Sequence, residues 1–270
     1  MAATLRRFAL LTVLGLFILF LYGPTLTILV LSFQGPDGGL TFPMNGFSLH
    51  WFYRLFQTQA VGDFGTSIAR SLVLATMVMV GTVVVSLAAG MAFRRRFWGS
   101  GPLFTLTVAS LIIPSILVSL GVGLLFNQLG LDPDWYSSAF GAQLTWTLPF
   151  GLLIMFAVFN RFDHAWEEAA RDQGATAWQS FRHVVLPIIL PSVIGIALFG
   201  FTLSYDEFAR TLLTAGSDNT LPLEIFGMTT SVTTPVLYAL GTLTTLFSFV
   251  VILFCLLIVR LLAAKRAITA

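Results

Sequence analysis

The chain has 270 residues, of which 57% are hydrophobic and 10% are charged, and its mean hydropathy is +0.90. A soluble domain carries about 25% charged residues, so this composition excludes an ordinary water-soluble fold and predicts that lipid surrounds most of the chain. The formal net charge of +2 gives no electrostatic reason to expect a nucleic-acid partner. The single cysteine, Cys255, lies in an apolar run and cannot form an intramolecular disulfide.

Six long apolar runs follow one another along the chain, and each can hold the roughly 20 apolar residues that a transmembrane helix needs. We therefore predict an all-α membrane protein with one transmembrane domain over residues 1–270. The expected spans are 8–33, 70–93, 102–127, 139–159, 188–208 and 235–259. Two arginines precede the first run, but it is too long for a signal peptide and no small-residue cleavage site closes it, so we expect a retained helix.

The basic residues between the spans predict the topology. Eleven of the fourteen lie before the first span, after the second, between the fourth and fifth, or after the sixth. Only Arg54, Arg70 and Arg210 fall on the other side. Because positive charge stays in the cytoplasm, both termini are expected to be cytoplasmic.

Two features of the spans and their connections can each be interpreted in two ways. The outside stretch 49–56 is aromatic and predicts a short helix at the membrane surface, either a simple anchor or a contact with a soluble partner. Pro114 and Pro149 interrupt the third and fourth spans, and such kinks either line a pathway or are ordinary features of a membrane bundle.

The longest cytoplasmic connection is the segment 161–187. Strong helix formers predict a helix from Glu167 to Gln173, which Gly174 then stops as a C-cap. A second short helix is expected over 175–185, ended by Pro187. Small side chains at 169 and 170 would let a partner approach closely, although this pattern alone describes only an amphipathic loop.

The spacing within this segment resembles the EAA motif of binding-protein-dependent ABC importer permeases. That motif has Glu-Ala-Ala, three residues, a glycine, nine residues, and then Ile-x-Leu-Pro. This chain has Glu168-Ala169-Ala170, Gly174 and Val184-Val185-Leu186-Pro187, with valine in place of isoleucine. The resemblance covers the chain from about the second span to the sixth. It implies a type I ABC importer permease in a bacterial inner membrane.

In that family the motif forms a coupling helix that docks in a cleft of the nucleotide-binding subunit. By resemblance, the ATPase-coupling residues expected here are Glu168, Ala169, Ala170, Asp172, Gly174, Ala175, Leu186 and Pro187.

The chain offers no site for nucleotide hydrolysis. A phosphate-binding P-loop requires Gly-x-x-x-x-Gly-Lys-[Ser/Thr], and the only lysine is Lys265, near the end of the chain. We therefore expect no cofactor in this chain, with ATP and Mg²⁺ bound by a partner ATPase. His50, His164 and His183 show no metal-ligand spacing, so neither a metal site nor a catalytic role is expected.

The stretch Thr202–Phe208, followed by Thr220–Leu223, resembles the spermidine/putrescine branch of these permeases. Asp206 and Glu207 are the acids nearest the hydrocarbon, and acids beside Tyr205 could receive ammonium groups through charge pairing and cation–π contact. The alternative is that both acids are hydrated at the outer edge of the fifth span.

The sequence thus predicts a permease subunit of an ATP-driven importer for a small organic solute, foremost a polyamine. An amino-acid-like or other small solute is the alternative within this class. An ion-gradient-driven carrier would need ionisable residues in mid-span and internal repeats, and neither is evident. The expected partners are an ABC ATPase dimer, a second permease (a paralogue, as the resemblance implies), an extracytoplasmic solute-binding protein and lipid.

Overall fold

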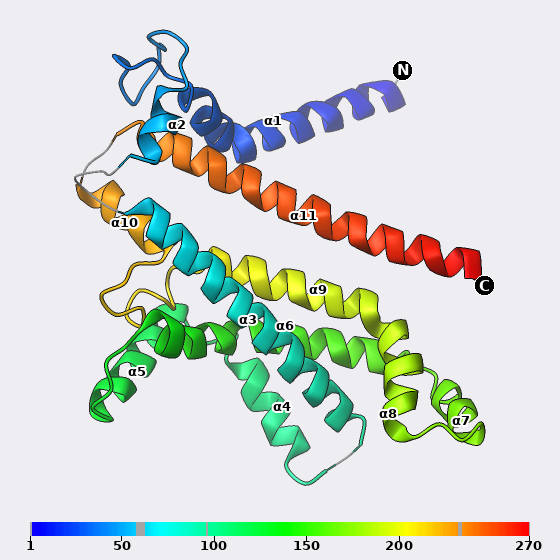
Figure 1. Cartoon of the computed structure of the whole chain (residues 1–270). Helices are drawn as coiled ribbons and strands as arrows, with labels where there is room; N and C mark the ends of the chain where they lie inside the picture. Colours follow the sequence, from blue (N-terminus) through cyan, green and yellow to red (C-terminus); the bar gives the residue numbers. More distant parts are fainter. Residues whose placement is uncertain (1, 58–62, 96, 232–233, 270) are drawn as a thin grey trace. The chain divides into compact units, whose positions relative to one another are not determined.

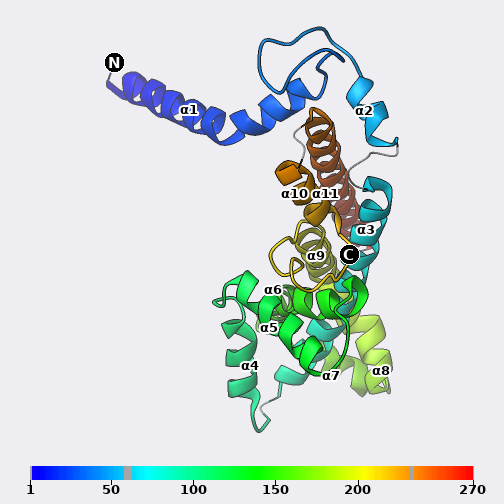
Figure 2. The same cartoon turned by 90° about the vertical axis from the view of Figure 1, so that its left-hand side faces the viewer.

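A computed structural model describes residues 2–57, 63–95, 97–231 and 234–269. These residues form helices and connecting turns without a named strand (Figure 1 and Figure 2). In chain order the helices are α1 Ala2–Leu31, α2 His50–Leu55, α3 Phe64–Phe93, α4 Ser100–Ala109, α5 Ser115–Gln128, the π-helix η1 Trp135–Ala139, α6 Phe140–Phe159, α7 Ala165–Asp172, α8 Ala177–Ser180, the π-helix η2 Phe181–Val185, α9 Leu186–Tyr205, α10 Leu221–Ser231 and α11 Val236–Thr269.

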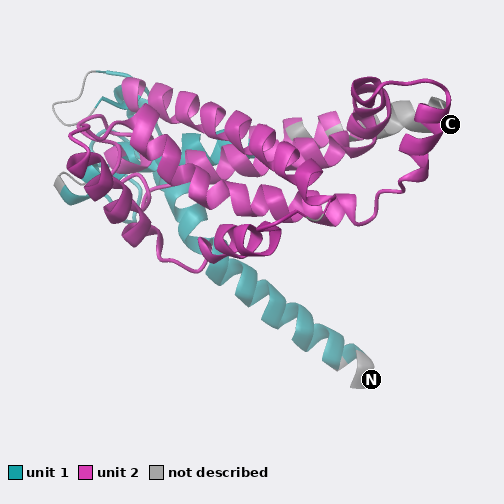
Figure 3. Ribbon diagram, turned by 90° about the horizontal axis from the view of Figure 1, so that it is seen from below, with its two compact units in different colours: residues 1–64, 225–249 teal, residues 65–224, 250–270 magenta. Residues whose placement is uncertain are grey.

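Five helices within the described ranges are long and apolar enough to cross a membrane. They comprise Arg6–Leu31, Phe64–Phe93, Trp135–Phe159, Ala177–Tyr205 and Val236–Ile258. The chain divides into two compact units, which Figure 3 shows in separate colours. Unit 1 contains residues 1–64 and 225–249, and unit 2 contains residues 65–224 and 250–270.

Unit 1 contains the loop between α1 and α2, which is organised around the buried side chain of Gln34. Its Nε2 donates to the carbonyl of Gly39 at 3.0 Å, and its Oε1 accepts from the amide of Asn45 at 2.8 Å. The aromatic stretch expected at 49–56 forms α2, where Trp51 and Leu55 are buried. The loop is therefore fixed by its own hydrogen bonds rather than by regular structure.

Unit 2 contains the packed helices α3, α6 and α9, which approach one another at small residues. A Cβ at Gly90 of α3 would lie 2.7 Å from the Cβ of Met155 on α6. A Cβ at Gly200 of α9 would lie 3.2 Å from the Cα of Met79 on α3. Small residues at helix crossings permit the close packing on which helix association in lipid depends.

The segment expected as the third span, 102–127, is divided into α4 and α5. Pro114 is the N-cap of α5 with an extended ψ of 131°, so the two helices do not form one continuous span. Proline disfavours helical geometry in the preceding residue and lacks the N–H that would continue the helix. Pro149, by contrast, lies inside α6 without ending it.

The prediction that Pro187 ends a second short helix is wrong. The helix continues from Ala177 through η2 into α9 and ends at Tyr205. The π-helical turn lies directly before Pro187, where an ideal α-helix would bring the proline ring against the carbonyl four residues earlier. A wider turn at this point allows the proline to stand within a continuous helix.

Candidate functional site

The segment 161–187 forms two helices joined at a tight turn. At the start of α7, the Asp163 carboxylate accepts from the amide of Ala165 at 2.9 Å. At its end, Gly174 donates its amide to the Arg171 carbonyl at 2.8 Å, and Ala175 donates to the Ala170 carbonyl at 3.1 Å. This pair of bonds is a Schellman motif, which satisfies carbonyls that the end of a helix leaves unpaired.

Gly174 occupies this turn because of its backbone conformation. Its φ is +84°, and a Cβ built at this position would meet nothing within 4 Å. A side chain would therefore be strained by the left-handed conformation and not by a clash within the chain. The prediction that Gly174 ends the helix is confirmed.

A capping box begins the next helix immediately after the turn. The Thr176 hydroxyl accepts from the Gln179 amide at 3.3 Å, and the Gln179 side-chain oxygen accepts from the Thr176 amide at 2.8 Å. The Schellman motif and the capping box share the short connection 173–176, so its backbone polar groups are bonded on both sides.

The expected coupling residues divide between two elements. The first six lie on α7 and its C-terminal turn, where Glu168, Ala169, Asp172 and Gly174 are exposed and Ala170 and Ala175 are half-buried. Leu186 and Pro187 instead begin α9. Two large apolar side chains flank the first group and had no part in the sequence prediction. Trp166 on α7 is 60% exposed and Trp178 on α8 is 65% exposed.

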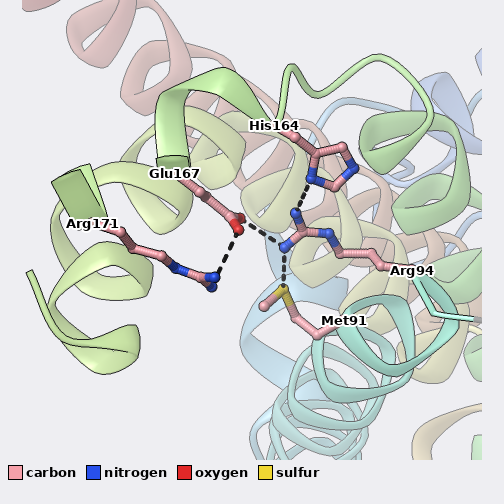
Figure 4. Close-up of polar contacts among 5 residues, drawn as sticks. All are labelled: Met91, Arg94, His164, Glu167 and Arg171. Carbon is pink, nitrogen blue, oxygen red and sulfur yellow. Dashed lines mark hydrogen bonds and ion pairs between the residues drawn. The ribbon is translucent and has the colours of Figure 1, made fainter. Parts of the chain in front are cut away.

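The other face of α7, which we call its inner face, contacts Arg94, the residue directly after the last turn of α3 (Figure 4). Arg94 Nη1 lies 2.7 Å from Glu167 Oε1, and both side chains are only 12% exposed. Arg94 Nη2 donates to His164 Nδ1 at 2.8 Å. Arg171 Nη2 lies farther from Glu167 Oε2, at 3.9 Å.

Aromatic rings cover the Arg94 guanidinium. Its Cζ lies 5.1 Å from the Phe159 ring centroid and 5.5 Å from that of Phe162. Shielding from water strengthens the ion pair with Glu167 and also makes the loss of either partner costly. The pair thus fixes α7 against the end of α3.

Sequence reasoning missed this pair, although part of its signal was present. Positions 164, 167 and 171 are spaced by three and four residues, which places them on one face of a helix. That spacing predicts which side of α7 faces inward. It does not identify Arg94 as the partner, because Arg94 lies 73 residues away.

The expected pathway residues at the end of α9 differ in exposure. Tyr205 is 5% exposed and stacks on Phe201, with ring centroids 6.1 Å apart. Asp206 is exposed. Glu207 Oε1 accepts from the amide of Arg210 at 2.8 Å, so this carboxylate caps its own turn. Of the three residues, only Asp206 is exposed.

Arg210 was expected only as a charge on the outer side, yet its side chain is fully buried. Its Nη2 donates to the Ser110 carbonyl at 3.4 Å, its Nε donates to Ser115 Oγ at 3.3 Å, and its Nη1 donates to Thr145 Oγ1. The Cζ lies 4.9 Å from the Trp146 ring centroid. Burial lowers the pKa of the Arg210 guanidinium, while the Glu207 carboxylate acts to raise it.

The position of Arg210 compensates for the break that Pro114 makes between α4 and α5. In a continuous helix the Ser110 carbonyl would accept from the amide of residue 114, but Pro114 has no N–H. The Arg210 guanidinium donates to this carbonyl instead. Ser119 Oγ in turn donates to the Arg210 carbonyl at 2.9 Å, which fixes the loop after α9 against α5.

A polar network joins this loop to α6 as well. Gln143 Nε2 donates to Thr211 Oγ1 at 2.9 Å, and Ser204 Oγ donates to Gln143 Oε1. All three residues are buried. Over the part of the chain that the structure describes, no three His, Cys, Asp or Glu side chains gather as a metal site.

Comparisons with known proteins agree on one class. The family model described as "binding-protein-dependent transport system inner membrane component" matches residues 83–267. The spermidine/putrescine transport system permease protein PotC of Haemophilus influenzae is 30% identical over 243 residues, which cover 89% of this chain and 92% of the relative. The putrescine transport system permease protein PotI of Escherichia coli is 28% identical over 232 residues, covering 83% and 81%.

Solved structures share the fold at lower identity. A bacterial ABC transporter involved in the import of the acidic polysaccharide alginate has a TM-score of 0.70 and 19% identity, with 95% of each chain covered. The MetNI methionine ABC transporter has a TM-score of 0.58 and 17% identity, covering 74% of this chain and 95% of the other.

Proposed function

Because the chain belongs to the family of binding-protein-dependent transport system inner membrane components, and is therefore a permease subunit of an ABC importer, we propose that its cargo is a polyamine. The relatives named for spermidine and putrescine align along most of this chain. The alginate and methionine transporters share the fold at 17–19% identity, which carries no argument about cargo.

Asp206 is the residue that we assign to the polyamine. Its carboxylate is exposed at the end of α9, whereas Glu207 is occupied by the Arg210 amide and Tyr205 is buried. An exposed carboxylate pairs with an ammonium group without first breaking an internal hydrogen bond. Of the three residues proposed to line the substrate pathway, Asp206 would therefore contact the polyamine directly. Tyr205 and Glu207 would support the structure around it.

The exposed face of α7 is the surface that we assign to a separate ATPase. Glu168, Ala169 and Asp172 form its polar and small part, and Trp166 and Trp178 form its apolar margins. Exposed aromatic residues, tryptophan above all, are enriched at surfaces that bind a partner protein. This assignment places the segment 161–187 in the cytoplasm, as the arginine distribution predicts, and places ATP and Mg²⁺ on the partner.

The proposed importer also contains a second permease, a paralogue of this chain, and a solute-binding protein outside the membrane. Most apolar side chains of α1 are exposed, Phe8, Phe17 and Phe20 among them, and they require lipid or another subunit to cover them. The family description names the dependence on a binding protein, and the stated partners extend that description to this chain.

Uptake by reconstituted proteoliposomes tests the proposal. We expect ATP-dependent accumulation of labelled spermidine or putrescine when the permeases, the ATPase and the loaded binding protein are all present. Omission of ATP or of the ATPase should abolish it, and an amino acid should not compete. Uptake driven by an ion gradient without the ATPase would refute the proposal, and ATP-driven uptake of an amino acid alone would refute the polyamine assignment.

A further inference from the structure

A cavity of about 370 Å³ lies between the end of α3, the inner face of α7 and the helix formed by α8 and η2. Three arginines line it, Arg94, Arg95 and Arg171, together with two glutamates. Glu167 is already paired with Arg94 at 2.7 Å. Beyond that pair, Arg95 and Arg171 face one further carboxylate, that of Glu168, so the lining keeps a single excess positive charge.

Several hydrogen-bond donors around this cavity lack a strong partner. The Arg95 side chain is exposed and forms no hydrogen bond or ion pair with the described residues. Arg171 has only the 3.9 Å contact with Glu167. Ser180 is 2% exposed, and its Oγ has no hydrogen-bond partner among the described residues. A buried hydroxyl without a partner is costly, and because Ser180 lines the cavity, a group bound there could satisfy it.

The hydrogen bond with Arg94 fixes the tautomer of His164, which also lines the cavity. Arginine can only donate, so the hydrogen bond from Arg94 Nη2 requires His164 Nδ1 to accept. The proton of the neutral ring therefore lies on Nε2. Two arginine forks and a hydroxyl together suit an anion with several acceptor oxygens.

One wall of the cavity is apolar and consists of Met91, Phe181 and Val185. The cavity also lies at the end of the apolar helix α3, on the side that the arginines assign to the cytoplasm. Basic pockets at this level between membrane helices bind anionic headgroups. We propose that this cavity binds a phosphate group, carried either by an anionic phospholipid headgroup or by a soluble phosphate ester.

Such a phosphate group would join Arg95, just after α3, to Arg171 on α7. It would lie beside the Arg94–Glu167 pair and add a second connection between the same two elements. The lining of the cavity alone would bind this group, whatever the cargo of the importer. The phosphate group would lie on the inner face of α7, and Glu168 would separate it from the face assigned to the ATPase.

Binding of short-chain phosphatidylglycerol to the purified importer tests this site, with phosphatidylcholine of the same chain length as the reference lipid. Arg95→Gln should weaken phosphatidylglycerol binding roughly tenfold, as expected for one lost charge-assisted hydrogen bond. Arg182→Gln is the matched control, because Arg182 is also exposed and lies on η2 without lining the cavity. It should bind like the wild type.

Competition with inorganic phosphate distinguishes the two sources. Displacement of the lipid, together with direct phosphate binding that is weakened by Arg95→Gln, indicates a soluble phosphate ester. Binding of phosphatidylglycerol that resists phosphate but depends on Arg95 indicates the lipid. Equal affinity of the Arg95→Gln and Arg182→Gln variants for both probes would overturn the proposal.

Ala177→Leu provides a second variant that retains every charge. Ala177 is exposed at the start of α8 and lines the cavity, so a larger side chain there occupies its volume. It should reduce phosphatidylglycerol binding at least as strongly as Arg95→Gln, while size-exclusion chromatography shows an intact complex. Wild-type affinity in both variants would exclude this cavity as the binding site.

Discussion

The Arg94 guanidinium and the Glu167 carboxylate lie 2.7 Å apart and tie the end of α3 to the inner face of α7. The neighbouring residue, Glu168, is exposed on the same helix, at the edge of the cavity beside this pair. Two adjacent glutamates therefore have different environments. One is held inside the protein, and the other is available to a partner.

Glu167→Gln should destabilise the protein by about 3 kcal/mol, because the Arg94 charge stays largely buried without its carboxylate. The measurement is thermal unfolding in detergent. Arg94→Gln should have a similar cost, and the double variant should lose less than the sum of the two. Strict additivity would show that the two charges do not interact.

Glu168→Lys should abolish ATP-driven uptake while leaving the unfolding temperature and membrane insertion unchanged. The side chain is exposed, so reversing its charge disturbs the proposed ATPase surface and the rim of the neighbouring cavity without disturbing the core. Co-purification of the ATPase with the variant permease measures the loss of docking. Normal uptake would contradict the assignment of this face.

Gly174 distinguishes a backbone requirement from a steric one. Its φ of +84° should cost an alanine about 1–2 kcal/mol, whereas asparagine tolerates this conformation better. If the backbone decides, Gly174→Asn should retain more uptake than Gly174→Ala, despite the larger side chain. The reverse order would show that the partner approaches the glycine too closely for any side chain, and Gly174→Val should abolish transport in either case.

Arg210→Gln should destabilise the protein by about 3 kcal/mol, since the guanidinium bonds to three elements from a fully buried position. Arg70→Gln is the control, because the Arg70–Asp218 pair at 2.8 Å is partly exposed and should contribute about 1 kcal/mol or less. Chemical unfolding of the two variants gives the comparison.

Pro114→Ala should partly rescue Arg210→Gln. Alanine supplies an N–H at residue 114 that can donate to the Ser110 carbonyl. The hydrogen bond from the Arg210 guanidinium to this carbonyl then contributes less to stability. The rescue appears as a positive coupling in a double-mutant cycle of unfolding free energies. Equal destabilisation by Arg210→Gln in both backgrounds would contradict this account of the break.

Asp206→Asn should raise the KM for polyamine uptake roughly tenfold, because it removes a charge-assisted contact with an ammonium group. Glu207→Gln should change the KM little, since its amide oxygen can still accept from the Arg210 amide. Initial rates in proteoliposomes measure both values. A larger effect at Glu207 would reverse the proposed roles of the two acids.

Local signals in the sequence were enough to predict part of the segment 161–187. Gly174 ends α7 because glycine adopts the left-handed conformation with little cost, and this rule needs no tertiary contact. The apolar runs likewise predict membrane helices from composition alone. These are features in which neighbouring residues decide the structure.

The features that the sequence did not predict depend on contacts between residues distant in sequence or on local changes in helix geometry. A proline within an apolar run does not reveal its outcome. Pro114 separates two helices, while Pro187 follows a π-helical turn and is absorbed. Nor does a charge count show that Arg210 reaches a carbonyl 100 residues away. Such pairings require the packed structure.

The uninterrupted helix from Ala177 to Tyr205 also has a mechanical consequence. Its 29 residues make a rod about 43 Å long, with the turn at Gly174 before one end and Asp206 just after the other. A tilt of about 10° would move the far end by about 7 Å if the rod stays straight. The π-helical turn at 181–185 interrupts the regular α-helical geometry near one end of this rod. Its stiffness then determines how much of a tilt at the Gly174 end is transmitted to the end beside Asp206.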